Sequence, residues 1–410
     1  MSEAPARPVV VQKFGGTSVA TTEGRAALSA RVRGALAAGR APVVVVSAMG
    51  RAGAPYATDT LLGLLEGFEP VPREADLLAS CGEVVTAVVV AHELRASGVP
   101  AMALTGGEAG VVSDGRFGDA RVLAVDPTAL AAAIADGVVP VVTGFQAVSA
   151  DGELTTLGRG GSDTSACAIA AALHAESVEI YTDVDGVMTA DPRACAEARV
   201  LDALQYEELF QMAKAGAKVM HAPAAEVAMG AGVPVWVRNT YSPARGTVIT
   251  SAARLAAEHA CGIATAVSHA DGIVRVTVAL ADGDHAARMA SLTRVFEAMA
   301  DSSVSLDMFT PCGDSLVFSF SEDELDVAAV VLEEVGLPSR IERGLAKVTL
   351  VGAGMHGVPG VMARVAEALS RAGAPILQIA DSHYTISVLV PQETSRDAIQ
   401  ALHREFTLGE

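Results

Sequence analysis

Residues 9–18 read VVVQKFGGTS, an apolar strand-like run that leads directly into two glycines. Adjacent glycines allow backbone N–H groups to approach a phosphate closely, and the helix start expected after them favours negative charge. Lys13, near the end of the run, could lie against a transferring phosphoryl group. A tight turn with a solvated lysine would look the same. The segment is not a Walker A loop, because no GK[ST] follows the glycines.

Strand-like and helical runs alternate outward from this stretch as far as residue 240. Strands are expected at 42–46, 100–104, 138–142, 178–181 and 233–237, and helices at 23–38, 74–97, 162–173 and 206–231. This alternation predicts an α/β domain with a mainly parallel sheet that is covered on both faces. A looser stretch at 242–262, with Pro243 and Gly246, is the expected domain boundary.

The remaining residues predict two copies of a smaller module. Amphipathic helical segments begin at Val295 and Val365, and two strands follow each of them. Matching positions differ by 70, the difference between 365 and 295. Such a repeat of βαββαβ type is typical of paired ferredoxin-like modules.

The composition limits the partners that the chain can have. A formal net charge of -19 argues against nucleic acid or an anionic membrane surface as a partner. Five cysteines without a CxxC pair argue against a disulfide framework or a zinc cluster and favour a reducing cytoplasm. No signal peptide is recognised after Met1, and no apolar run approaches the roughly 18 to 20 residues of a membrane helix. We therefore expect a soluble cytoplasmic protein.

Two further segments place polar residues at the start of a helix or the end of a strand. GRGGSDTS at 158–165 exposes its backbone through three glycines, and Arg159 there could bind a carboxylate in bidentate fashion. A glycine-rich helix cap would have the same composition. YTDVDGVMTADPR at 181–193 begins at a strand end and carries three aspartates. Loops at the carboxyl ends of parallel strands are where α/β sheets bind ligands.

Together these segments resemble the amino-acid kinase family, and within it the aspartate kinases. The resemblance rests on these strings, in the family's order over about residues 9–250: KFGGTSV, VVVVSAMG, CGE, TTLGRGGSDTSA, YTDVDGVMTADPR, GAKVM and VRNTYS. SAMGRAGAPYATDTLLGLL and ILQIADSHYTISVLV are most similar to diaminopimelate-sensitive enzymes of Gram-positive bacteria. The resemblance implies a three-layer amino-acid kinase fold with a mainly parallel central sheet, followed by two ferredoxin-like ACT domains. The implied division is a catalytic domain at 1–245, a linker at 246–262, and ACT domains at 263–344 and 345–410.

The resemblance also implies an activity. The γ-phosphoryl group of ATP, used with Mg²⁺, would pass to the β-carboxylate of L-aspartate and give 4-phospho-L-aspartate. This would be the first step toward lysine and diaminopimelate, threonine and methionine. A carboxylate of pKa ~3.9 is already a nucleophile at neutral pH, so no general base is needed. ACT domains imply feedback regulation and a homodimer or higher oligomer. The expected effector at their interface is diaminopimelate first, then lysine or threonine.

Roles for individual residues follow from the same resemblance. Lys13, Glu83 and Asp163 match catalytic positions. Arg159 matches the arginine that holds a substrate carboxylate, and Glu83 matches the acid that meets the ammonium group. Further substrate contacts are matched by Thr58, Phe145 and Ser162. The nucleotide-binding positions are matched by Lys13, Phe14, Gly15, Gly16, Ser47, Thr182, Asp183, Met188, Asp191, Arg193 and Lys218. No residue is assigned to a metal ion.

Three features depart from the family pattern. Residues 222–224 read APA and lack an arginine that family members often carry there, and the insertion at 51–56 lengthens the loop before Thr58. Residues 282–285 read DGDH where an effector-binding turn usually carries Pro-Gly, whereas 358–360 keep VPG. The effector site of the first ACT module is therefore in question.

Alternative interpretations remain open. The same chemistry could act on glutamate, N-acetylglutamate or an aspartate analogue, although Glu83 favours a free amino group. A non-catalytic amino-acid sensor is the third possibility, and the presence of Lys13, Arg159 and Asp183 argues against it. GAGMHG at 352–357 has the form of a dinucleotide-binding GxGxxG, but only 53 residues follow Gly357, the difference between 410 and 357. This is too short for such a domain.

Overall fold

The computed structural model describes residues 7–69, 71–217, 220–258, 262–280, 285–355 and 357–409. It divides the chain into two compact units, which are described separately. The first comprises residues 1–187, 200–213 and 218–260, and the second residues 188–199, 214–217 and 261–410.

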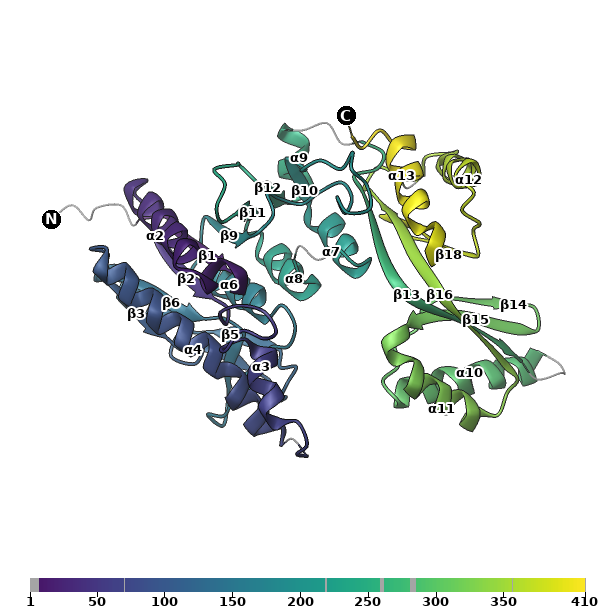
Figure 1. The fold of residues 1–410 in the computed structure, drawn as a ribbon, viewed down its shortest axis with the longest axis horizontal. Helices are drawn as coiled ribbons and strands as arrows, with labels where there is room; N and C mark the ends of the chain where they lie inside the picture. Colours follow the sequence, from purple (N-terminus) through teal and green to yellow (C-terminus); the bar gives the residue numbers. More distant parts are fainter. Residues whose placement is uncertain are drawn as a thin grey trace. The chain divides into compact units, whose positions relative to one another are not determined.

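Strand β1 (Val9–Phe14) lies inside the eight-stranded sheet of the first unit (Figure 1). The strand order is β10-β12-β11-β9-β1-β2-β6-β3, and every neighbouring pair is parallel except β11 with β12. The other strands are β2 (Ala41–Val46), β3 (Ala101–Leu104), β6 (Val139–Thr143), β9 (Ser177–Thr182), β10 (Ala203–Gln205), β11 (Val235–Asn239) and β12 (Thr247–Thr250). The predicted mainly parallel sheet is confirmed, and the carboxyl ends of β1, β2, β6 and β9 meet at one edge.

Helices cover both faces of this sheet, which explains why β2 is buried along its whole length. On one face α2 (Thr22–Ala37) and α4 (Pro72–Ala96) pack against Val44, Val46 and Phe14 in a single apolar cluster. On the other face α6 (Gly161–Ala172) packs against β1, β2 and β9 and also contacts α8 (Ala222–Ala231). Because side chains alternate along a strand, Phe14 points toward α2 and α4 while Lys13 points toward α6.

A smaller four-stranded sheet flanks the central one, in the order β5-β4-β7-β8. Its strands are β4 (Val111–Ser113), β5 (Val122–Val125), β7 (Gln146–Ser149) and β8 (Leu154–Thr156), and α4 packs against β8. Short helices α1 (Gly16–Ala20), α3 (Thr58–Leu62), η1 (Gly63–Leu65) and α5 (Thr128–Ala135) lie in the connections. The sequence patterns did not predict this second sheet, because its strands are only three or four residues long.

The second unit is built on one six-stranded antiparallel sheet, in the order β14-β15-β13-β16-β18-β17. Its strands are β13 (Ala266–Ala279), β14 (Asp307–Cys312), β15 (Ser315–Ser321), β16 (Ser339–Val351), β17 (Gln378–Asp381) and β18 (Thr385–Pro391). The helices are α10 (His285–Asp301), α11 (Leu325–Val335), α12 (Val361–Arg371) and α13 (Ser395–Glu405), with single 3₁₀ turns η2 (Glu322–Glu324) and η3 (Gln392–Thr394). The repeat is visible in the fold, since Val295 of α10 and Val365 of α12 are both fully buried. Residues 344 and 345, the expected border of the two modules, both lie in β16.

Two expectations about elements were wrong. Residues 206–231 form two helices, α7 (Tyr206–Lys214) and α8, rather than one. Gly216 takes a φ of +103°, which no helix accommodates, and Pro223 then sits in the first turn of α8. The stretch 242–262, expected to be loose, contains β12 and α9 (Ala252–Glu258).

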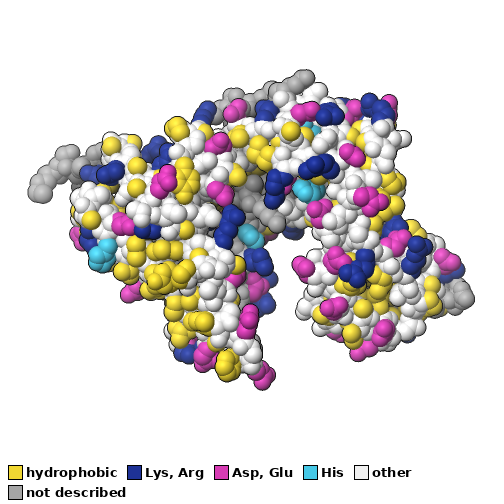
Figure 2. Space-filling model, viewed as in Figure 1, with side chains coloured by type: hydrophobic (Ala, Val, Ile, Leu, Met, Phe, Trp, Pro, Cys, Tyr) yellow, Lys and Arg dark blue, Asp and Glu magenta, His cyan; other side chains and the backbone are white. Residues whose placement is uncertain are grey.

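Helix α4 is long and apolar enough to cross a membrane by length and composition, contrary to the expectation from the sequence. Half of its most apolar window is buried inside the first unit, and its inner side carries buried Asp76 and Glu83. Figure 2 shows hydrophobic side chains gathered over α3 and α4, where Leu77 and Val88 are exposed. We interpret α4 as a core helix with an apolar outer side.

Candidate active site

Lys13 and Asp163 form the centre of the candidate site. Lys13 is the fifth residue of β1 and Asp163 stands in the first turn of α6, and their Nζ and Oδ1 atoms lie 2.6 Å apart. The two side chains are only 12% and 9% exposed. The contact is a close ion pair. An ammonium group has three N–H donors, so Lys13 keeps donors for other oxygens.

The glycine turn after β1 is tightly enclosed. A Cβ on Gly16 would lie 2.6 Å from Ala48 O and 2.7 Å from Gly50 O, so only glycine fits beneath the loop that follows β2. Gly50 N–H donates to Gly16 O, and Ser47 N–H donates to Phe14 O. The structure thus brings KFGG and Ser47 side by side.

Glu83 lies on α4 beside the same loop. Its side chain is buried, and Oε1 accepts a 3.0 Å hydrogen bond from Ala48 N. Oε2 is buried with no partner in the described part of the chain, and burial raises the pKa of the carboxyl to about 7. Helix α4 can approach the loop after β2 this closely because residue 82 is glycine: a Cβ there would lie 2.4 Å from Tyr56 O. A buried carboxylate oxygen without a partner is suited to a cationic group of a ligand.

Asp76 on the same helix shows what a purely structural carboxylate looks like. It stands seven residues before Glu83, about two helical turns, and so on the same side of α4. Asp76 accepts hydrogen bonds from Gly118 N, Thr156 N and Thr156 Oγ1 at 2.7–3.0 Å. Every oxygen of Asp76 is therefore used within the fold, in contrast to Glu83. No motif in the sequence indicated a role for Asp76.

The turn at 158–161 presents Arg159 and Ser162. Gly160 is left-handed with a φ of +70°, and a Cβ there would lie 2.2 Å from the His221 ring. Ser162 is buried against Gly144, whereas the guanidinium of Arg159 is exposed and makes no ion pair with any described residue. Arg159 is therefore available to an anion.

Phe145 follows β6 with a φ of +70°, an unusual value for a residue with a side chain. Its N–H donates to Ser165 Oγ at 3.1 Å, and its ring would contact any Cβ on Gly161. Strained backbone of this kind is concentrated at binding sites. Thr58, half-buried at the start of α3, is the remaining expected substrate residue of this unit.

The expected nucleotide-binding residues divide between the two units. Thr182 ends β9, and Asp183 accepts hydrogen bonds from Thr182 Oγ1 and from exposed Arg51 Nη2 at 3.2 and 3.0 Å. Met188, Asp191 and Arg193 belong to the second unit.

There Asp191 accepts from Arg193 in a local ion pair of 2.6 Å, and this hydrogen bond lowers the pKa of Asp191. Lys218 lies outside the described residues. Met188, Asp191 and Arg193 are therefore described with the second unit, whereas Lys13 is described with the first.

A network that the sequence did not predict supports β1 and β9. Buried Glu179 accepts from Gln12 Nε2 at 2.8 Å and from Tyr181 Oη at 2.9 Å, and Arg238 lies 3.3 Å away. Gln12 directly precedes Lys13, so this network fixes the strand that carries the lysine. The only sequence signal for this network was Gln12, a polar residue within an apolar strand.

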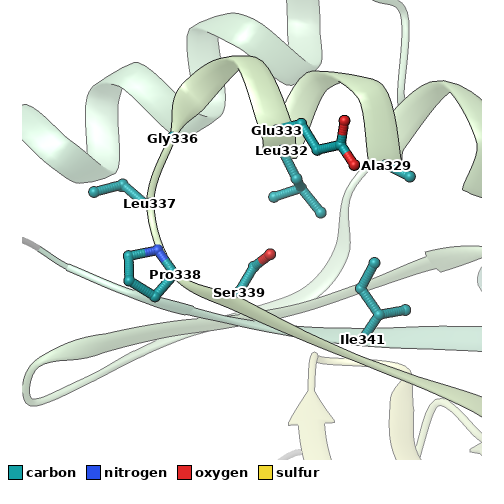
Figure 3. Close-up of a pocket in the computed structure, with 8 residues that line it drawn as sticks. All are labelled: Ala329, Leu332, Glu333, Gly336, Leu337, Pro338, Ser339 and Ile341. Atoms are coloured by element: carbon teal, nitrogen blue, oxygen red, sulfur yellow. The ribbon is translucent and has the colours of Figure 1, made fainter.

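Two cavities in the described part of the chain lie away from these residues. One of about 380 Å³ in the second unit is lined by the end of α11 and the start of β16, including Leu332, Pro338 and Ile341 (Figure 3). Another, of about 400 Å³ in the first unit, is lined by Glu179, Trp236 and Arg238 among others. Neither contains an expected catalytic or substrate residue.

Comparison with protein families matches residues 8–239 to the amino acid kinase family and residues 340–404 to an ACT domain. Aspartokinase 1 of Bacillus subtilis is 42% identical over 405 residues, which are 98% of this chain and 99% of that protein. The aspartokinase of Mycolicibacterium smegmatis is 39% identical over 418 residues, 98% of this chain and 96% of that protein.

Solved structures give the same result. Aspartokinase III of E. coli in complex with aspartate and ADP, in its R-state, is similar with a TM-score of 0.82 at 27% identity. The match covers 97% of this chain and all of that one. The same enzyme in complex with lysine and aspartate, in its T-state, gives a TM-score of 0.76 at 27% identity, covering 97% and 99% of the two chains.

Proposed function

Because the chain belongs to the amino acid kinase family, as an ATP-dependent aspartate kinase with C-terminal ACT domains, we propose how its residues perform that reaction. Lys13 stabilises the transferring phosphoryl group, Asp163 orients Lys13, and Glu83 and Arg159 hold aspartate by its opposite charges. The observation that carries this proposal is the 2.6 Å contact between Lys13 and Asp163, two residues 150 positions apart in an acidic chain with few cations.

Aspartate offers two carboxylates and one ammonium group, and the site has complementary charges. The free oxygen of Glu83 receives the ammonium, and Arg159 binds a carboxylate in bidentate fashion. Thr58 and Ser162 supply hydroxyl groups to the same substrate. Phe145, whose backbone φ is +70°, lines the site between β6 and α6. An N-acylated substrate lacks the positive charge and would leave Glu83 without a partner.

ATP is proposed to bind at the carboxyl ends of β1, β2 and β9. The backbone N–H of Gly16 is proposed to face the phosphates, with Phe14, Gly15 and Ser47 around them, because the Gly15 N–H already donates to Tyr181 O. Thr182 and Asp183 lie at the end of β9. Met188, Asp191, Arg193 and Lys218 complete the nucleotide site in this proposal.

Mg²⁺ prefers phosphate, water and one or two carboxylate oxygens. Asp183, 49% exposed and at the right strand end, fits as one such donor. The ion would neutralise charge on the phosphate oxygens.

The reaction itself needs positioning more than proton transfer. A β-carboxylate oxygen of aspartate forms a bond to the γ-phosphorus in line with the bond that breaks to ADP. The leaving ADP carries away the electron pair, and no proton has to move. Lys13 is proposed to hold negative charge on the γ-phosphoryl oxygens. Its side chain is only 12% exposed, and a positive charge is most effective where water is excluded.

The C-terminal repeat is proposed to regulate this activity. The proposed division is a catalytic domain at 1–245, a connection at 246–262 that includes β12 and α9, and ACT domains at 263–344 and 345–410. A lysine-pathway amino acid, diaminopimelate before lysine or threonine, would bind between ACT domains of a homodimer. The second module is the better candidate, because Gly360 after Pro359 takes a φ of +90° at the start of α12. The expected 282–284 turn of the first module lies outside the described residues. A cytoplasmic location and a first step toward lysine, threonine and methionine fit this function.

Replacing Arg159 tests the substrate half of the proposal. Arg159→Ala removes a charge-assisted bidentate contact, so the KM for aspartate should rise roughly 10- to 100-fold with a small change in the KM for ATP. Arg33→Ala removes an exposed arginine from α2 and serves as the matched control. An unchanged KM for aspartate in Arg159→Ala would remove this residue from the substrate site.

Substrate choice is tested by trapping the acyl phosphate with hydroxylamine. ATP-dependent hydroxamate should form from aspartate, and much less from glutamate or N-acetylglutamate. Faster reaction with N-acetylglutamate would contradict the role of Glu83.

A further inference from the structure

Cys195, Glu197 and His403 form a side-chain cluster in the second unit that the kinase reaction does not use. Their candidate ligand atoms all lie within 4.8 Å of one another. Cys195 and His403 are 1% and 0% exposed, whereas Glu197 is exposed. Cys195 and Glu197 come from one turn of the 188–199 segment, and His403 from the last turn of α13.

The imidazole of His403 has one ring nitrogen engaged and one without a partner. Nε2 lies 2.9 Å from Thr189 Oγ1, and that hydroxyl is itself held by Arg199 N at 3.1 Å. Nδ1 is buried and makes no hydrogen bond to any described residue. In the tautomer in which Nε2 donates to Thr189, Nδ1 carries a bare lone pair. Metal-binding histidines have this arrangement, with the second nitrogen fixed by a hydrogen bond.

We propose that Cys195 Sγ, His403 Nδ1 and a carboxylate oxygen of Glu197 bind a thiophilic divalent cation of the Zn²⁺ class. Thiolate, imidazole and carboxylate are the usual protein ligands of Zn²⁺, whereas Mg²⁺ and Ca²⁺ prefer oxygen ligands alone. Three protein ligands leave a fourth position for water. The Cys-x-Glu spacing with a distant histidine is not one of the usual zinc motifs, so the sequence alone does not predict this site.

Binding requires a small rearrangement. Zinc–ligand bonds of about 2.0–2.3 Å need the three donors closer together than they stand, and the exposed Glu197 is the one that can move. Arg404 contacts both Glu197 oxygens at 3.1 Å, so the ion must take one oxygen while Arg404 keeps the other. The Cys195 thiol loses its proton to solvent when the S–metal bond forms, so binding should strengthen as pH rises. The bound ion would link the 188–199 segment to α13.

The test is a Co²⁺ titration of metal-free full-length protein without nucleotide, with Cys195→Ser, His403→Gln and Cys312→Ser as variants. Cys312 is an exposed thiol outside the cluster and is the matched control. Wild type and Cys312→Ser should each bind one equivalent per chain and develop the near-ultraviolet charge-transfer absorption of a cobalt–thiolate bond. Cys195→Ser and His403→Gln should bind at least about 10-fold more weakly, and Cys195→Ser should lose the absorption.

Zn²⁺ should compete with Co²⁺ for the wild-type site and raise the melting temperature of wild type more than that of Cys195→Ser. Absence of the cobalt–thiolate absorption in the folded wild type would overturn the proposal, whatever the variants do. Persistence of the absorption in Cys195→Ser, or its loss in Cys312→Ser, would overturn it equally. Because no step of this test involves ATP or aspartate, its outcome is independent of the kinase mechanism.

Discussion

Two buried carboxylates on the inner side of α4 differ in their hydrogen-bond partners, and this difference distinguishes a structural residue from a binding one. Asp76 accepts four hydrogen-bonding contacts from Thr156 of β8 and from Gly118, so both of its oxygens have partners inside the fold. Glu83 receives only one such bond, from Ala48 N, and one of its oxygens remains buried without a described partner. A group left in this condition costs stability unless a ligand completes it. The ammonium of aspartate is the completing group in our account.

Glu83→Gln should raise the KM for aspartate about 10- to 100-fold, because an amide cannot neutralise the ammonium group. The turnover number at saturating aspartate should fall much less. Steady-state kinetics with aspartate as the varied substrate measures the split. Glu66→Gln, in an exposed residue after η1, is the control and should leave both constants unchanged.

The same residue predicts a pH dependence. Burial raises the pKa of Glu83 from 4.5 to about 7, so the carboxyl is protonated below that pH and cannot pair with the ammonium. The kcat/KM for aspartate should therefore rise between about pH 6 and pH 8 and then level off, and Glu83→Gln should abolish this step.

The effect of Glu83 on the stability of the fold has the opposite pH dependence. A raised pKa in the folded state means that the contribution of this group is greatest below pH 4.5 and is lost as pH rises through about 7. Glu83→Gln should accordingly melt at a higher temperature than wild type at pH 8. A lower melting temperature there would contradict the burial argument.

The roles of individual site residues stay predictions made from motifs. Lys13, Glu83, Arg159 and Ser162 were assigned through motifs, and the structure brings Lys13 to Asp163 and Glu83 to the loop after β2. Asp76 and Glu179 could not be predicted, because a buried acid on a helix or strand gains its meaning only from partners distant in the chain.

The turn that begins α6 is the element on which the substrate site depends. Gly160 precedes the helix with a φ of +70°, and the ring of His221 fills the space where a side chain would be. The turn places Arg159 outside and Ser162 inside, with Asp163 one residue further on against Lys13. Any change that moves this turn should therefore disturb substrate binding and the Lys13 contact together.

Gly160→Ala tests this element. The left-handed backbone alone should cost about 1–2 kcal/mol, and the clash with the His221 ring should add to it. Gly152→Ala is the matched control, since Gly152 has a φ of +84° but nothing within 4 Å of a Cβ. Chemical denaturation should show a larger loss for Gly160→Ala, accompanied by a raised KM for aspartate that Gly152→Ala lacks. Equal losses with unchanged kinetics would contradict the account.

Elements were predicted where periodicity is long and uninterrupted, as in α2, α4 and α6. The division between α7 and α8 was missed because the apolar spacing continues through Gly216, and only its φ of +103° reveals the break. The small sheet was missed because three-residue strands have no measurable alternation.

At the scale of the whole molecule, one chain carries a catalytic unit and a second unit that shares one six-stranded sheet between two modules. The 188–199 segment, which includes the proposed nucleotide residues Asp191 and Arg193, is compact with the second unit rather than with the first. Ala190 and Cys195 of this segment pack into the same apolar core as Leu402 of α13. A ligand that alters the second unit therefore acts on residues proposed to contact ATP.

This arrangement predicts linked binding. If diaminopimelate, lysine or threonine inhibits the enzyme by raising the KM for ATP or aspartate, that substrate must weaken effector binding by the same factor. Isothermal titration of the effector, with and without a non-reacting ATP analogue and aspartate, measures the coupling. An inhibitor whose affinity does not change in the presence of substrates would exclude a binding equilibrium as the means of regulation.

The most direct test of the whole account is the rate of aspartyl phosphate formation by Lys13→Gln, measured as hydroxamate at saturating ATP and aspartate. Glutamine can still donate a hydrogen bond to Asp163, so the fold should persist, while the positive charge is lost. We expect kcat to fall by about 10²-fold or more with little change in KM, and no loss of rate in the exposed control Arg33→Gln. A Lys13→Gln variant that turns over at close to the wild-type rate would contradict the account.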